Sequence, residues 1–194
     1  KQDILNKVAG GSFLTTSINE STIFSREDFT DEHKEIEAMV KGFCKEEVAP
    51  VKDQLEKKNK ELTFSLIKKV GELGLMGVEV PEEYGGMDLD KITGAIVAES
   101  SSYSECSSFV VSWSTNSGIG SLPIVWFGTP AQKEKYLPRL IDGTSIGAYG
   151  LTEPSAGSDA LSAKTTAVLS DDGKHYILNG EKVFITNGGW ADVY

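Results

Sequence analysis

Apolar residues recur every three or four positions through the first three quarters of the chain, which is the spacing of an amphipathic helix. The first stripe follows Asp31 and lies opposite a face rich in Lys and Glu. Its members are Ile36, Met39, Val40, Phe43, Cys44, Val48 and Val51. Pro50 should kink or end this helix, because proline lacks the amide hydrogen that an interior turn needs. The pattern predicts a first helix from Asp31 that is interrupted near Pro50.

Two more helices are expected before residue 105. The second should follow a cap at Thr63 or Ser65 and stop at Gly74. The third should begin near Asp88 or Asp90, since a carboxylate at that position accepts a hydrogen bond from an unpaired backbone amide. The apolar positions of the second helix are Leu66, Ile67, Val70 and Leu73, and those of the third are Ile92, Ala95 and Ile96.

The next stretch, 107–127, is apolar but rich in Ser and Gly, and it predicts one long, buried and thin helix. After it, Thr129, Pro130 and Gln132 form a helix start of the capping-box type. That helix should run to Gly143.

Beyond Gly143 the apolar pattern changes to strand-length runs at 164–169, 174–178 and 181–186. Ser-Asp-Asp-Gly separates the first two runs. Asn179-Gly180, a favoured two-residue hairpin turn, separates the last two. The runs predict an antiparallel meander. Helices followed by strands indicate an α+β fold, mainly α, with segregated layers, and they disfavour the alternating pattern of a dinucleotide-binding sheet.

This change of pattern divides the chain into an N-terminal extension (1–28), a helical domain (29–144) and an incomplete β-domain (145–194). The run 190–194 is a strand pattern without a partner. We therefore expect the chain to be the front part of a longer protein.

Composition and charge exclude several classes of protein. The chain has 194 residues with 39% hydrophobic and 25% charged residues, which is a globular composition. The sequence has no secretory signal and no apolar stretch of about 18 residues, so no membrane span is expected. Its 19 Lys and Arg against 29 Asp and Glu, a net charge of −10, argue against nucleic acid. Two distant cysteines suit a reducing compartment, hence the cytoplasm, or the mitochondrial matrix in a eukaryote. No Cys or His pair has metal-ligand spacing, so we expect no metal site.

Ser145 lies in Gly-Thr-Ser-Ile-Gly, which matches the G-x-S-x-G motif of serine hydrolases. That motif needs a strand before the serine and a helix after it, whereas here a helix precedes and a strand follows. Only His33 and His175 could serve as the base. A glycine-containing loop between helix and strand is favoured, and a hydrolase through Ser145 stays an alternative. Close helix packing is likewise favoured over a phosphate loop for 117–123.

Two other segments offer groups for a ligand. In the loop 149–159, the residues Thr152, Ser155 and Ser158 supply hydroxyls, and Gly157 allows close backbone approach. Spacing alone favours an ordinary turn there. In the run 183–188, Phe184 and Thr186 should lie on one face of a strand, where an aromatic plane beside a hydroxyl suits a flat heterocycle. Core packing of the phenyl ring is the simpler reading of that pattern.

Taken together, these motifs resemble the acyl-CoA dehydrogenase family. The resemblance rests on YGLTEPSAGSD and LNGEKVFITNGG, preceded by LGLMGVEVPEEYGGMDLD and FGTPAQKEKYLPRLIDG, and it covers about residues 29–194. The GGSFL and GTPAQKEKYLP segments are most similar to the very-long-chain branch. The implied fold is an N-terminal helical domain followed by the opening antiparallel strands of a β-barrel-like middle domain.

The resemblance implies a flavoprotein that binds FAD and oxidises a fatty acyl-CoA to the trans-2-enoyl-CoA, as in fatty acid β-oxidation. In the family a glutamate removes the α-proton, the β-hydrogen leaves as hydride to the flavin, and electrons pass to an electron-transferring flavoprotein. The full-length protein is expected to be a homo-oligomer, and the isolated fragment is expected to be inactive. A non-catalytic assembly module of the same fold remains the other alternative.

The resemblance also assigns residues. Ser158 would contact both cofactor and substrate, and Gly118 and Ser121 would leave room for the acyl chain, with tight helix packing as the alternative. Glu153 is not expected to be the base, because the family's base lies in a C-terminal helical domain that this chain lacks; no catalytic residue is expected here. The implied cofactor contacts are Tyr149, Leu151, Thr152, Gly157, Ser158, Phe184, Ile185 and Thr186.

Overall fold

The computed structural model describes residues 24–194, so most of the expected N-terminal extension, residues 1–23, lies outside the described residues. The chain forms two compact units, one ending at Glu35 and one from Ile36 to Tyr194. In the first unit, the rings of Phe29 and His33 meet edge to face with centroids 5.6 Å apart.

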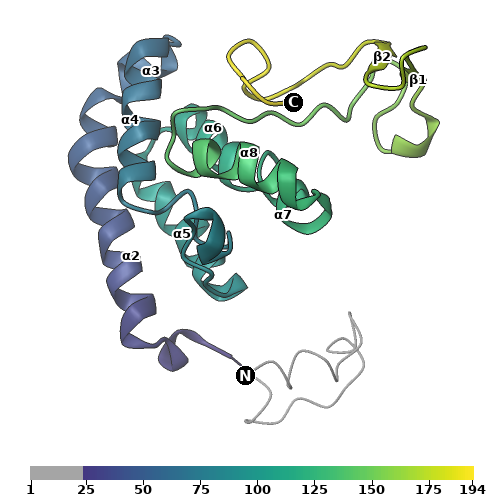
Figure 1. The fold of residues 1–194 in the computed structure, drawn as a ribbon. Helices are drawn as coiled ribbons and strands as arrows, with labels where there is room; N and C mark the ends of the chain where they lie inside the picture. The colour runs from purple at the N-terminus through teal and green to yellow at the C-terminus, as the bar shows by residue number, and fades with distance from the viewer. Residues whose placement is uncertain (1–23) are drawn as a thin grey trace, which may run out of the picture. The chain divides into compact units, whose positions relative to one another are not determined.

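The second unit is mainly helical and has a two-stranded antiparallel sheet after its last α-helix (Figure 1), which confirms the predicted fold class. The strands are β1 (Thr166–Leu169) and β2 (Tyr176–Asn179). The α-helices of the described residues are α2 (Asp31–Phe43), α3 (Lys52–Glu56), α4 (Lys60–Glu72), α5 (Lys91–Ser101), α6 (Ser107–Ser117), α7 (Leu122–Phe127) and α8 (Pro130–Ile141). Single 3₁₀ turns cover Arg26–Asp28, Ala49–Val51, Glu82–Tyr84, Ser102–Ser104 and Ala160–Ser162, and a π turn covers Cys44–Val48.

Side-chain caps begin the helices largely where the sequence predicts them. Asp90 accepts a hydrogen bond from the Thr93 amide at 2.9 Å, and Thr129 forms the predicted capping box. The second helix begins earlier than expected. Asn59 caps it, and Thr63 lies inside the helix with its hydroxyl bonded to the Asn59 carbonyl at 2.8 Å. An Asn three residues before an orphan amide is as good a cap as Thr or Ser.

The long apolar stretch 107–127 was predicted as one helix and is two. Helix α6 ends at Ser117, and Gly118 departs from helical geometry with φ −94° and ψ −104°. A tight turn then leads to α7, with the buried Ser121 hydroxyl donating to the Asn116 carbonyl at 2.5 Å. The glycines allow this sharp turn, which periodicity alone cannot reveal.

The core lies between the helices of the second unit. Phe43, Phe109 and Trp113 form an aromatic group with ring centroids 6.2–6.5 Å apart. Aliphatic side chains surround it, among them Val40, Val48, Leu66, Ile67, Val70 and Leu137. Burial of each such side chain contributes roughly 1.5–3 kcal/mol, so this core is the main source of stability. Pro50 interrupts the first helix as predicted, and both flanking segments still supply core residues.

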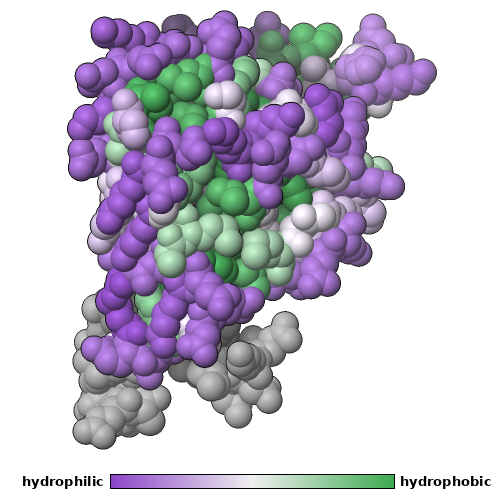
Figure 2. All heavy atoms as spheres, turned by 90° about the vertical axis from the view of Figure 1, so that its left-hand side faces the viewer, coloured by the Kyte–Doolittle hydropathy of each residue, from purple (hydrophilic) through white to green (hydrophobic). Residues whose placement is uncertain are grey.

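On the face shown in Figure 2, polar side chains surround a broken patch of apolar ones, as expected for amphipathic helices. Met39 and Leu73 are among the partly exposed apolar residues of the chain. Within residues 24–194, no helix is long and apolar enough to span a bilayer. The same residues contain no group of three or more His, Cys, Asp or Glu side chains placed to hold a metal.

Strands β1 and β2 pair with Thr166 opposite Asn179 and Leu169 opposite Tyr176, which confirms the first predicted hairpin. Every residue of both strands is exposed, and in Figure 1 the hairpin stands clear of the helices. The second predicted hairpin, at Asn179-Gly180, is wrong. Residues 181–186 form no strand, because their hydrogen bonds go to the loop around Thr152 instead of to β2.

Candidate functional site

The loop that carries the first ligand motif leaves the helical core through a buried joint. Asn116, on α6, is fully buried; its side-chain oxygen accepts from the Gly147 amide at 2.6 Å, and its side-chain nitrogen donates to the Leu140 carbonyl at 2.9 Å. One amide side chain thus connects α6, α8 and residue 147. Because both bonds are buried, this joint fixes where the loop begins.

The segment that carries the second motif is held at the same place. Asn187 donates from its side chain to the carbonyls of Ser112 and Gly147, each at 3.1 Å. Asp192 accepts from the Ile146 amide at 2.9 Å, and the Ala148 amide donates to the Val193 carbonyl at 2.9 Å. Residues 146–148, which precede the first motif, and residues 187–193, at the end of the second, therefore lie side by side against α6.

The two motifs themselves also meet. The Val183 amide donates to the Thr152 carbonyl at 2.9 Å, and Lys182 Nζ donates to the Leu151 carbonyl at 2.9 Å. Within the loop, Glu153 and Ala156 exchange backbone hydrogen bonds at 3.0 and 3.1 Å, closing a tight turn over Pro154. Segments about 30 residues apart thus form one surface.

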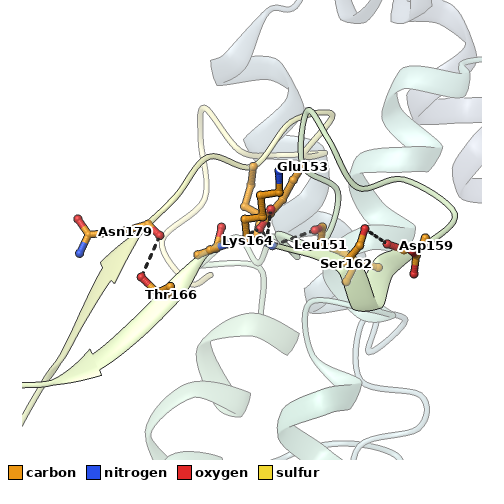
Figure 3. A network of polar contacts seen from close by, with 9 residues as sticks. Leu151, Glu153, Asp159, Ser162, Lys164, Thr166 and Asn179 are labelled. Atoms are coloured by element: carbon orange, nitrogen blue, oxygen red, sulfur yellow. Dashed lines mark hydrogen bonds and ion pairs between the residues drawn. The ribbon is translucent and has the colours of Figure 1, made fainter.

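Glu153 is the centre of a polar network between these segments (Figure 3). Its carboxylate accepts from the backbone amides of Lys164 and Thr165 at 2.6 and 3.0 Å, and from Lys182 Nζ at 2.8 Å. The Glu153 side chain is only 5% exposed, so these bonds replace water almost completely. A buried carboxylate is stable only when it is paired in this way.

The same contacts control the ionisation of Glu153. The Lys182 ammonium is the largest cause, followed by bonds from Thr165 and Lys164, and together they lower the pKa of this carboxyl to about 2. Glu153 therefore stays ionised at neutral pH and is a poor proton acceptor. This agrees with the expectation that it is not a catalytic base.

The structure presents the predicted cofactor contacts at the surface of these segments. Tyr149, Leu151, Gly157 and Ser158 are exposed on the loop, and Phe184 is 93% exposed. Residues Thr152, Ile185 and Thr186 are half-buried. Across the described part of the chain, no hydrogen bond occupies the hydroxyls of Thr152, Ser155, Ser158 or Thr186, so these groups are available to a ligand.

One detail of the prediction is wrong. Phe184 and Thr186 do not share a face of a strand, because Phe184 has a φ of +56° and no strand forms there. The chain bends between two anchored points. On one side Lys182 and Val183 bond the loop at residues 151 and 152, and on the other side Asn187 bonds the Ser112 carbonyl of α6. The bend directs the phenyl ring outwards, so packing of Phe184 in the protein core is excluded as well.

The predicted substrate contacts Gly118 and Ser121 lie in the turn between α6 and α7. A Cβ added to Gly118 would meet the Ser114 carbonyl oxygen at 2.7 Å, and one added to Gly120 would meet that of Thr115 at 2.9 Å. These small residues therefore serve close packing of the turn. Gly118 is nevertheless half-exposed, and Val111 and Ser114 are exposed at helical spacing before it.

The serine hydrolase alternative finds no support in the geometry. Ser145 is only 2% exposed, its amide donates to the Arg139 carbonyl at 2.8 Å, and helix α8, not a strand, precedes it. His175 is exposed at the turn of the β1–β2 hairpin. Ser145 thus has the surroundings of a packed loop residue.

Three residues that build the site were missed by the sequence analysis: Lys182, Asn187 and Asn116. Each acts on a partner at least 24 residues away, so no local spacing marks it. An open cleft of about 490 Å³ lies between α7, α8 and residues 192–194, and none of the predicted site residues line it.

Two protein families match this chain. "Acyl-CoA dehydrogenase, N-terminal domain" matches residues 30–144, and "Acyl-CoA dehydrogenase, middle domain" matches residues 148–194. A probable acyl-CoA dehydrogenase of Bacillus subtilis (strain 168) is 51% identical over 95% of this chain and 31% of its own length.

Solved structures agree. An acyl-CoA dehydrogenase from Bacillus anthracis complexed with FAD superposes with a TM-score of 0.90 and 50% identity over 95% of this chain and 31% of that one. Butyryl-CoA dehydrogenase from Megasphaera elsdenii gives a TM-score of 0.75 and 36% identity over 89% of this chain and 45% of that one. The two matched domains follow one another along the chain, the helical domain first and the segment with the loop and hairpin second. This chain belongs to the acyl-CoA dehydrogenase family. It spans about a third of the length of the Bacillus relatives.

Proposed function

We propose that this chain is part of an FAD-dependent enzyme that oxidises a fatty acyl-CoA thioester to the trans-2-enoyl-CoA, a step of fatty acid β-oxidation. The observation that carries the proposal is the meeting of the two motif segments at Thr152 and Val183, with unoccupied hydroxyls and an exposed aromatic ring beside them. Family membership identifies the ligand class that this surface suits.

The residues present fit a flavin. Leu151 and Thr152 offer backbone groups and a hydroxyl to the edge of a ring system, and Phe184 offers an aromatic plane. Ser158 and Gly157 suit the diphosphate, since Gly157 has no heavy atom within 4 Å of its ideal Cβ position and so leaves open space. FAD, when bound, supplies the hydride acceptor for the β-hydrogen. The relative from Bacillus anthracis is described as an FAD complex, which supports this assignment.

The described residues hold substrate and cofactor and do not supply the base. Glu153 is fully engaged by two backbone amides and Lys182, so it has no role in removing the α-proton. The base glutamate implied by the resemblance belongs to a C-terminal helical domain, which the two matched domains do not include. The task of the site described here is to orient the thioester against the flavin and to exclude water.

We further propose that the acyl chain runs along α6 and past Gly118, while the buried Ser121 supports the turn behind them through its bond to the Asn116 carbonyl. Val111 and Ser114 are exposed on one face of this helix, and the half-exposed Gly118 follows at the helix end, at intervals of three and four. Enlarging Gly118 would distort the helix end, so Ser114→Leu is the cleaner test. We expect this change to shift selectivity towards shorter acyl-CoAs. Unchanged selectivity would remove the groove from the proposal.

An electron-transferring flavoprotein as acceptor and a homo-oligomeric full-length enzyme complete the proposal, both on the basis of the family resemblance. The decisive experiment uses the natural polypeptide that contains this sequence. Its anaerobic visible spectrum should show bound flavin, and a matching acyl-CoA from a graded series should bleach it. A colourless protein that binds no added FAD would overturn the proposed function and favour an assembly module.

A further inference from the structure

The contacts of Glu153 join three pieces of chain that are distant in sequence. The residue itself belongs to the loop, Lys164 and Thr165 lead into β1, and Lys182 follows β2. A single buried carboxylate therefore fixes the loop against both ends of the hairpin. The Val183–Thr152 and Lys182–Leu151 bonds each join two of these pieces. Within residues 24–194, Glu153 is the residue whose hydrogen bonds join all three.

Glu153 and Lys182 have separate tasks in this arrangement. Glu153 satisfies two backbone amides, and only an acceptor group can do that. Lys182 neutralises the buried charge and also donates to the Leu151 carbonyl at 2.9 Å. Leu151 and Thr152 are thus anchored through their carbonyls, Leu151 by Lys182 and Thr152 by the Val183 amide. These two bonds use only the carbonyls, so the Thr152 hydroxyl and the exposed side chain of Leu151 remain available to a ligand.

We propose that Glu153 and Lys182 are positioning residues for the loop 149–159, the proposed flavin-binding loop. They hold residues 151 and 152 in register with residue 183 without touching the reacting atoms. This inference rests on the proposed function, because the loop is taken to be the cofactor-binding segment. It assigns to Glu153 a role different from proton transfer, and it explains why a carboxylate inside a ligand motif is turned inwards.

The test measures FAD binding to the flavin-free natural polypeptide by quenching of flavin fluorescence. Glu153→Gln keeps one acceptor oxygen but removes the charge, and Lys182→Met leaves the carboxylate without its partner. We expect each of these two changes to weaken FAD binding by about 10- to 100-fold, the size of a lost charge-assisted hydrogen bond. Lys182→Arg keeps both charge and donors and should bind FAD nearly as well as the wild type.

A second readout does not depend on flavin. In the flavin-free protein, the amides of Lys164 and Thr165 should be protected from hydrogen exchange in the wild type. In Glu153→Gln, which retains one acceptor oxygen for the two amides, at least one of them should lose that protection. The matched control is Glu47→Gln, which removes an ion pair with Lys69 at 2.7 Å between two half-exposed side chains. We expect this control to change neither FAD binding nor exchange at residues 164 and 165.

The outcomes separate the two proposals. If the wild type binds FAD and Glu153→Gln binds it equally well, the positioning role is overturned and the proposed function stands. Unchanged exchange at Lys164 and Thr165 overturns it as well. If the wild type binds no FAD, both proposals fall. Where Glu153→Gln does not fold, the lysine pair decides: weak binding by Lys182→Met with retention by Lys182→Arg, at equal melting temperatures, supports the role, and equal loss in both overturns it.

Discussion

The helical region and the segment after residue 148 are held together by different forces. In the helices, apolar side chains such as Val40, Ile67 and Trp113 are buried and form one core. Among residues 149–194, only Glu153 and Ala156 are buried. That segment depends on polar bonds from Glu153, Asn187 and Asp192. Stability therefore comes mainly from the helical core, whereas residues 149–194 carry the proposed ligand surface. Each part should respond to a different kind of mutation.

The largest expected effect is in the helical core. Trp113→Ala in the natural polypeptide removes a side chain that is 2% exposed and packs against Phe43 and Phe109. We expect a loss of about 3–5 kcal/mol in the free energy of unfolding of this domain, measured by denaturant titration. A loss below about 1 kcal/mol would show that the aromatic group is not a central part of the core.

The next effect is at the joint between the two regions. Asn116→Leu leaves the Gly147 amide and the Leu140 carbonyl without partners in a buried place. We expect a loss of about 2–3 kcal/mol in the free energy of unfolding. The control is Ser117→Ala, which removes one bond to the Trp113 carbonyl from a half-exposed side chain. Equal losses in both variants would contradict a special role for the joint.

A smaller, local effect is expected at Asn187. This residue has a φ of +63° and bonds two carbonyls. Asn187→Gly keeps the backbone conformation and loses the bonds, at a cost of about 1 kcal/mol, whereas Asn187→Ala adds backbone strain. Hydrogen exchange at residues 188–194 should rise from wild type to Gly to Ala. If Ala and Gly exchange alike, the backbone conformation contributes nothing.

The smallest effect near neutral pH concerns Glu153. Its pKa in the folded protein is lowered from an ordinary 4.5 to about 2. The stabilisation from its ionised form is therefore present above pH 4.5 and is lost as the pH falls towards 2. Amide shifts of Lys164 and Thr165, followed by NMR, should titrate with a midpoint near 2 and should not titrate in Glu153→Gln. A midpoint near 4.5 would show that the network is open to water.

The sequence predicted the helical region well because its signals are local. The caps at Asp90 and Thr129 and the break at Pro50 each depend on residues within one turn. The break at Gly118 was missed, because an apolar run does not show where its helix bends. The cap of the second helix is Asn59 and not Thr63 or Ser65, and the sequence alone does not separate the three because all these residue types serve as caps.

The candidate site could be predicted only in part. Its two motif segments were identified, and the structure brings them together at Thr152 and Val183. The geometry at Phe184 and the absence of a strand at 181–186 could not be predicted, since they depend on Lys182 and Asn187 bonding partners 31 and 75 residues away. Asn-Gly favours a tight turn only where a second strand is free to pair.

The bonds of Asn187 also constrain the order of events during synthesis. Its side chain reaches the Ser112 carbonyl across 75 residues, whereas the capping bonds of the helices span three. The entropy of closing a loop grows with its length, so the capped helices form with far smaller closure costs. Because ribosomes release the N-terminal part first, the helical core can assemble while residues 149–186 are still emerging. The bonds of Asn187 then join the newly made segment to a domain that is already folded.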